Sequence, residues 1–203
     1  HDPATSRFGE SVYSFLPRSI IGGFKSFLQI EKQLVQRKGI TAFSLRDRRV
    51  RYTASLLVMY VGAFVLTGLV GLMVIVLQGV VAFLMLEVIN YLEHYGLARK
   101  EIAAHRFEKV EPAHSWSSPH RLTGWILFGL PRHADHHARA ARHYPILRHL
   151  DEAPQLPMGY ASMLLVALLP PLWRRVMDPR VMAVRGITPP DEQEANSMTG
   201  IPT

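Results

Sequence analysis

The sequence contains no cysteine, and this absence excludes several kinds of chemistry. Disulfides, thiolate metal sites, iron–sulfur clusters and a cysteine nucleophile are all ruled out. Any metal must therefore be held by histidine and carboxylate side chains. Acidic residues are also scarce, because 16 Asp and Glu stand against 23 Lys and Arg, which gives a net charge of +7. Such a charge suits nucleic acid or an anionic membrane surface as a partner.

Charged residues of both signs make up only 19% of the 203 residues, whereas 48% are hydrophobic. The first residues, "HDPATSRFGES", have neither the basic region nor the apolar core of a signal peptide. Together with His1 in place of methionine, this start predicts that the beginning of a longer protein is missing. No internal repeat is present.

One long hydrophobic run extends from Ala54 to Ile89, and Glu87 is its single ionisable side chain apart from Tyr60. Runs of 18 or more apolar residues are typical of transmembrane helices. A straight helix of this length would measure about 54 Å, which exceeds the bilayer hydrocarbon core of about 30 Å. The run therefore predicts a hairpin of two crossings, with a turn near residues 68–71 or 78–79.

Basic residues flank this run on both sides, at 46–51 ("RDRRVR") and at Arg99 and Lys100. Because basic residues favour the cytoplasmic side, two basic flanks predict an even number of crossings. The alternative is a buried hairpin of a soluble protein. Contact with the cytoplasmic leaflet accounts for the net positive charge, and no interleaving of aromatic and basic residues favours nucleic acid.

The predicted fold class is mainly α, an integral membrane helical bundle with a histidine-rich cytosolic lobe. Apolar residues recur at helical spacing over 8–38 and predict an amphipathic helix. The apolar patch 160–173 is too short to span a bilayer, so it is predicted to dip into the interface or to pack on the lobe. The regions are juxtamembrane cytosolic helices over 1–52, the hairpin over 53–97, the lobe over 98–182 and a polar flexible tail over 183–203.

Histidines are concentrated in "LPRHADHHARAARHY", residues 130–144. His133, His136 and His137 are spaced i, i+3, i+4, so in a helix they share one face. Neutral imidazole is a good ligand for iron, zinc or copper. His136 and His137 diverge by about 100° around a helix, so they could serve two different metals, or one metal and a partner. The alternative is a histidine-rich solvated face.

The carboxylate of Asp135 lies within this motif and could orient a ligand imidazole as a hydrogen-bond acceptor. Five further histidines are interpreted as structural: His105, His114, His120, His143 and His149.

A polar stripe ends the hydrophobic run. Glu87, Asn90, Tyr91 and His94 are spaced i, i+3, i+4, i+7 and share one helical face. Polar residues inside a membrane are costly and usually face a site. The stripe therefore predicts that Glu87 and His94 face inward at the cytosolic end of the bundle. Glu93 neighbours His94 but points elsewhere. The alternative is a polar patch at a helix end that reaches water.

Two motifs together, "NYLEHYGLAR" (90–99) and "LPRHADHHA" (130–138), resemble the third and fourth histidine motifs of the membrane-bound alkane 1-monooxygenases. The similarity extends to about residue 182 and places the chain in the wider superfamily of histidine-motif desaturases and hydroxylases. It implies a multi-pass enzyme of the bacterial inner membrane with two non-haem iron ions on the cytoplasmic side. Such an enzyme inserts one atom of O2 into the terminal methyl group of a medium-chain n-alkane and releases a primary alcohol.

The resemblance also implies site residues and partners. The electrons would come from rubredoxin, which a rubredoxin reductase reduces. The implied iron ligands are His94, His133, His136 and His137, and the side chains expected to support them are Glu87, Asn90, Glu93 and Asp135.

Two earlier histidine motifs of the family, of the forms HExxHK and EHxxGHH, are not in the sequence. The chain is therefore expected to be a C-terminal fragment that is inactive alone. Other interpretations are an oxidase that resembles the xylene monooxygenases or the desaturases, and a truncated membrane protein that binds one metal ion, such as zinc, without catalysis.

Overall fold

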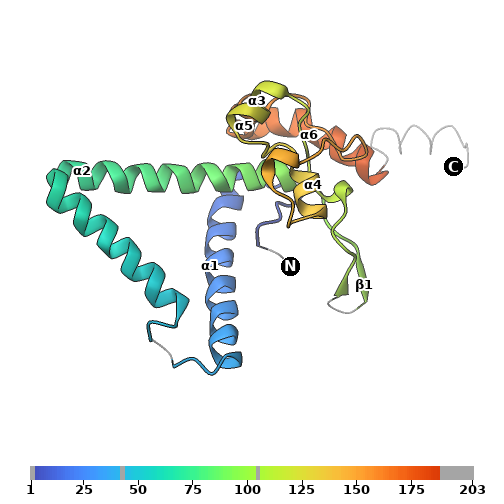
Figure 1. Ribbon diagram of the computed structural model, residues 1–203. Coiled ribbons are helices and arrows are strands. Elements are labelled where there is room, and N and C mark those ends of the chain that lie inside the picture. Colours follow the sequence, from blue (N-terminus) through green and yellow to red (C-terminus); the bar gives the residue numbers. More distant parts are fainter. Residues whose placement is uncertain (1–2, 42–43, 104–105, 188–203) are drawn as a thin grey trace, which may run out of the picture. The chain divides into compact units, whose positions relative to one another are not determined.

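The computed structural model describes residues 3–41, 44–103 and 106–187, and the described chain is mainly helical (Figure 1). It divides into two compact units. One unit comprises His1–Leu16 together with Val88–Thr203, and the other comprises Pro17–Glu87.

The Pro17–Glu87 unit holds most of two helices, α1 (Val12–Arg37) and α2 (Arg48–His94). The amphipathic helix predicted over 8–38 is confirmed by α1. Gly39 follows this helix with a φ of 58°, a left-handed conformation that glycine adopts at helix C-termini without a steric penalty.

A sharp kink divides α2 at Gly68, whose φ of 68° and ψ of −166° are not helical (Figure 1). Such angles are accessible to glycine because it has no Cβ. Just before the kink, the Thr67 hydroxyl donates a hydrogen bond of 2.6 Å to the carbonyl of Ala63. The break predicted near residues 68–71 is confirmed, whereas the alternative at 78–79 lies in regular helix. The segment 48–67 has the ~20 residues that a bilayer crossing needs, and the segment 69–94 is a few residues longer.

Among the described residues, α2 is the one helix that is long and apolar enough to cross a membrane. No part of its most apolar stretch is buried inside the protein, and Leu66 next to the kink is 84% exposed. An uninterrupted apolar surface of this kind indicates contact with lipid or with other protein. It does not match the buried hairpin of a soluble protein. The two crossings and the helical bundle stay predictions.

The other unit has an aromatic core around the last turn of α2. The rings of Tyr91, Tyr95 and Trp173 pack with centroids 5.1–5.3 Å apart. The apolar patch 160–173 forms α5 (Tyr160–Ala167) and the start of α6 (Pro170–Arg185), and its buried residues join this core. Of the two predictions for that patch, packing on the lobe is therefore the one that the structure shows.

The remaining elements of this unit are short. Strand β1 (Glu101–Ala103) pairs antiparallel with β2 (Arg106–Phe107). The helical segments between β2 and α5 are η1 (Pro112–His114), α3 (Arg121–Ile126), α4 (His133–Ala138) and η2 (Tyr144–Ile146). Of the tail predicted over 183–203, the first residues to Arg185 belong to α6, and residues 188–203 lie outside the described residues.

Candidate metal centre

His94 is the last residue of α2, and a tight turn follows it. Gly96 has a φ of 70°, and its N–H donates a hydrogen bond of 3.1 Å to the carbonyl of Ser6. A Cβ atom at this position would lie 2.7 Å from a methyl carbon of Val181, so the turn accepts glycine alone without rearrangement. Helix α2 therefore ends at His94, and the tight turn leads the chain into the lobe that His94 faces.

The second part of the centre is the short helix α4. Pro131 ends the preceding segment, and its carbonyl accepts a hydrogen bond of 2.9 Å from the N–H of Ser118. Arg132 is the N-cap residue, and His133 opens the helix. Since His133 and His137 are one turn apart, their side chains leave α4 on the same side.

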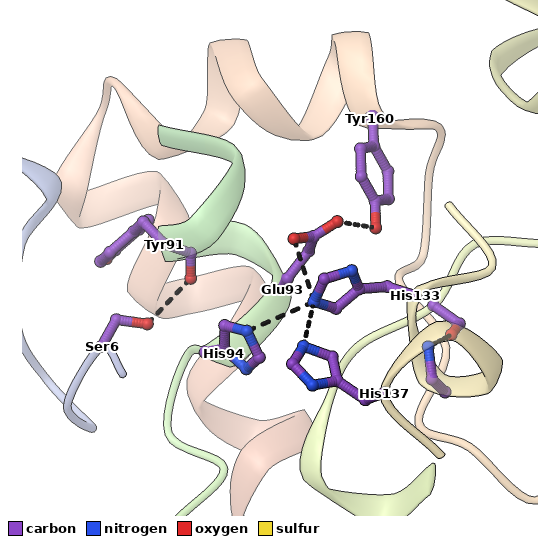
Figure 2. A network of polar contacts seen from close by, with 9 residues as sticks. Ser6, Tyr91, Glu93, His94, His133, His137 and Tyr160 are labelled. Atoms are coloured by element: carbon purple, nitrogen blue, oxygen red, sulfur yellow. Dashed lines mark hydrogen bonds and ion pairs between the residues drawn. The ribbon is translucent and has the colours of Figure 1, made fainter. Parts of the chain in front are cut away.

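The three imidazoles of His94, His133 and His137 meet, and we call these residues the histidine cluster (Figure 2). The Nε2 atom of His133 lies 2.7 Å from Nε2 of His137 and 3.3 Å from Nε2 of His94. One nitrogen from each ring lies within 4.8 Å of the others, which is a spacing that could hold a metal ion. Convergence of three nitrogens from two separate elements is an arrangement that a cation stabilises.

The charge state of His133 suits a ligand. Burial and the neighbouring imidazoles of His94, His137 and His136 lower its pKa to about 2. Its ring is therefore neutral at physiological pH. Neutral imidazole offers a lone pair, which is the form that binds transition metals.

One carboxylate touches the cluster. The Oε2 atom of Glu93 lies 3.2 Å from Nε2 of His133, and its Oε1 atom accepts a hydrogen bond of 3.0 Å from the hydroxyl of Tyr160 (Figure 2). Burial and the adjacent Glu93 raise the pKa of Tyr160 well above its usual value, so this phenol stays a donor. Helical periodicity predicts that the side chain of Glu93 points in another direction than that of His94. Both nevertheless reach His133, because side chains about 100° apart on one helix can approach a group that lies between them.

Tyr160 was not identified from the sequence. It precedes an apolar run, where nothing marks a tyrosine as more than core, and it lies 67 residues from Glu93 along the chain. Only the packing of α5 against the end of α2 brings the two side chains together.

Asp135 is buried and anchors α4 to the segment that follows it. Its carboxylate accepts hydrogen bonds of 2.6 and 2.8 Å from the guanidinium of Arg142, and one of 2.8 Å from the N–H of Arg148. Desolvation opposes its ionisation, but these bonds outweigh that effect and lower the pKa of Asp135. The hydrogen bonds of this carboxylate therefore come from the guanidinium of Arg142 and the backbone of Arg148, whereas the sequence suggested a ligand imidazole as its partner.

We expect Arg142→Gln to destabilise this part of the lobe. The side chains of Arg142 and Asp135 are only 12% and 3% exposed, so the variant leaves a buried carboxylate without its charged partner. A loss of about 1–3 kcal/mol in the free energy of unfolding follows. Thermal or denaturant unfolding measures it. Arg139→Gln, at an exposed position, is the matched control and should stay within about 0.5 kcal/mol of wild type. Equal effects of the two variants would contradict the anchoring role.

The other predicted site residues are not among the three converging histidines. His136 is exposed, and its ring centroid is 5.9 Å from that of His137. Within the Pro17–Glu87 unit, Glu87 accepts a hydrogen bond of 2.6 Å from the hydroxyl of Ser19. Asn90 is half-buried.

The histidines interpreted as structural have other surroundings. His114 contacts Glu108 at 2.9 Å, His120 contacts the hydroxyl of Ser118 at 3.0 Å, and His149 lies 3.3 Å from Asp151. The exposed His143 precedes η2, and His105 lies outside the described residues.

Comparison with known proteins shows the family. The chain matches the fatty acid desaturase family over residues 1–167 and belongs to that family. It is 44% identical over 182 residues to alkane 1-monooxygenase 2 of Pseudomonas aeruginosa, and 45% identical over 183 residues to alkane 1-monooxygenase 2 of Alcanivorax borkumensis. Each match covers 90% of this chain and 48% of the relative.

A more distant relative is the xylene/toluene monooxygenase hydroxylase component XylM of Pseudomonas putida, which is 32% identical over 181 residues. This match covers 85% of this chain and 45% of XylM. The chain thus spans about half the length of the curated relatives that it matches. These relatives are monooxygenases by name, and the desaturase family together with the histidine cluster indicates metal binding.

Proposed function

We propose that the chain is part of an alkane 1-monooxygenase that hydroxylates the terminal methyl group of medium-chain n-alkanes. The observation that carries this proposal is the convergence of His94 with His133 and His137, in a chain 44% identical to an alkane 1-monooxygenase. The balanced reaction combines the alkane with O2, two electrons and two protons, and gives the primary alcohol and water. Rubredoxin is the proposed source of the electrons.

The proposed metal is iron, in a centre of two ions. The histidine cluster would hold one of them, and three imidazole nitrogens suit iron. His136 is exposed beside His137 and is not one of the three converging histidines, so we assign it to the second ion. When bound, iron supplies the activation of O2 that a strong, unpolarised C–H bond requires.

The protein's own residues then have defined tasks. The end of α2 and α4 hold the imidazoles at fixed distances, and the buried environment of His133 keeps its ring neutral. An alkane offers no polar group, so its binding depends on the burial of methylenes at about 0.8 kcal/mol each. The exposed apolar surface of α2 is consistent with a substrate that reaches the enzyme through lipid.

We place the enzyme in the bacterial inner membrane, with α2 crossing it twice and the histidine cluster on the cytoplasmic side. The kink at Gly68 supports two crossings, and the basic residues at 46–51 and 99–100 support the orientation. A second candidate activity, hydroxylation of aromatic methyl groups, is favoured by the similarity to XylM.

The test is product analysis with oxygen-18-labelled O2. Membranes that contain the full-length enzyme of which this chain is part, together with rubredoxin, its reductase and NADH, should convert octane into 1-octanol that carries the label. His94→Ala should reduce this product to background, because it removes one of the three imidazoles of the cluster. Label in products of p-xylene but not of octane would favour the second candidate. Absence of labelled product from both substrates, or unchanged turnover in His94→Ala, would contradict the proposal.

A further inference from the structure

The buried pair of Glu93 and Tyr160 has a role that packing does not explain. Their side chains are 1% and 2% exposed. Burial of a carboxylate costs free energy unless it is hydrogen-bonded, and burial of a charge costs several kcal/mol. A core position that served packing alone would be better filled by an apolar residue of similar volume. The pair therefore needs an explanation at the group it touches, which is His133.

The two oxygens of Glu93 have separate partners. Oε1 accepts the hydrogen bond from the Tyr160 hydroxyl at 3.0 Å, while Oε2 lies 3.2 Å from Nε2 of His133. The main chain of Glu93 is also fixed, since its carbonyl accepts a hydrogen bond of 2.8 Å from the N–H of Trp116. With one oxygen and the backbone held, the other oxygen remains directed at the histidine cluster, as Figure 2 shows.

The direction of the carboxylate matters because of charge. The three converging nitrogens all belong to imidazoles, which carry no negative charge. A divalent cation placed among neutral ligands in a buried site has its charge uncompensated, and a fixed carboxylate nearby lowers that cost. The Oε2 atom of Glu93 approaches the same Nε2 atom of His133 that contacts the other two imidazoles, so the carboxyl group lies beside the place where the three nitrogens converge.

We propose that Tyr160 is a positioning residue of the metal centre, which holds the Glu93 carboxylate against His133 so that the histidine cluster binds a cation more tightly. This inference rests on the proposed function in one respect only, which is that the cluster binds a metal ion. The hydroxyl of Tyr160 supplies the positioning, and its ring contributes to the core.

Cobalt(II) is a suitable probe, because its ligand-field absorption reports on coordination independently of turnover. The purified full chain is titrated with Co²⁺ as wild type, Glu93→Gln and Tyr160→Phe. Partners outside the ligand set affect metal affinity by about 10–100-fold. We expect Glu93→Gln to weaken binding within that range. Tyr160→Phe, which removes only the hydroxyl, should weaken it by about 10-fold and shift the absorption bands.

Tyr91→Phe is the matched control. Tyr91 is also buried, and its hydroxyl donates a hydrogen bond of 2.7 Å to the carbonyl of Glu10, away from the cluster. It should lower stability without a change in cobalt affinity or spectrum. Tyr160→Phe with wild-type affinity and spectrum would overturn the inference. If Tyr160→Phe does not fold, Glu93→Gln decides, and its unchanged affinity would overturn the inference as well. A wild-type protein that binds no cobalt would instead overturn the metal centre itself.

Discussion

Replacement of His133 by alanine is expected to abolish metal binding at the histidine cluster. Its Nε2 atom is the one that contacts both of the other imidazoles, at 2.7 Å from His137 and 3.3 Å from His94. Loss of a partner outside the ligand set costs about 10–100-fold in metal affinity, so loss of a central ligand should exceed that range. Equilibrium dialysis with Co²⁺ or Fe²⁺, followed by elemental analysis, measures the bound metal per chain.

The matched comparison is His136→Ala, three residues further along α4. His136 is exposed and lies outside the group of converging nitrogens, so the cluster should retain its ion in this variant. If the protein carries a second ion, His136→Ala should remove that ion alone. Equal loss of cluster metal in both variants would contradict the assignment of His136, and full retention in His133→Ala would contradict the cluster.

Replacement of Gly96 by alanine is expected to cause the largest loss of stability among single substitutions in the turn after His94. Two costs combine there. The φ of 70° is left-handed, which costs a residue with a Cβ about 1–2 kcal/mol. The new atom would also lie 2.7 Å from Val181, and overpacking of this kind costs about 1–3 kcal/mol. Denaturant unfolding should therefore show a loss of about 2–5 kcal/mol.

Gly186→Ala separates the two costs. Gly186 has a similar φ of 64°, but nothing lies within 4 Å of a Cβ built on it. This control should lose only the conformational part, about 1–2 kcal/mol. The double variant Gly96→Ala, Val181→Ala should be more stable than Gly96→Ala by the overpacking cost, reduced by the cost of the cavity that Val181→Ala leaves. Equal losses of stability for Gly96→Ala and Gly186→Ala would show that the contact with Val181 adds nothing to the cost of a Cβ at position 96.

The elements that depend on local sequence were predictable. The helix over 8–38 follows from apolar spacing, and α1 extends over Val12–Arg37. The length of the apolar run required a break, and glycine at 68 made that the favourable place, because its φ of 68° is open to glycine. The i, i+4 spacing likewise predicted that His133 and His137 share a face, which the distance of 2.7 Å between their Nε2 atoms bears out.

The parts that depend on tertiary packing could not be predicted. Around the axis of α4, the side chains of His136 and His137 lie on opposite sides of the direction in which the side chain of His133 leaves the helix. Periodicity alone cannot tell which of the two faces the end of α2. The cluster includes His137, while His136 is exposed. Tyr160 is a further case, since its contact with Glu93 arises from the docking of α5 in the core rather than from any motif.

The central claim is that imidazoles from the end of α2 and from α4 bind one metal ion together. X-ray absorption at the iron edge of the iron-loaded protein tests it most directly, because imidazole rings give characteristic outer-shell scattering. The account predicts a histidine signal in the wild type that decreases in His94→Ala and in His137→Ala alike. A spectrum without imidazole scattering, or one that neither substitution changes, would contradict it.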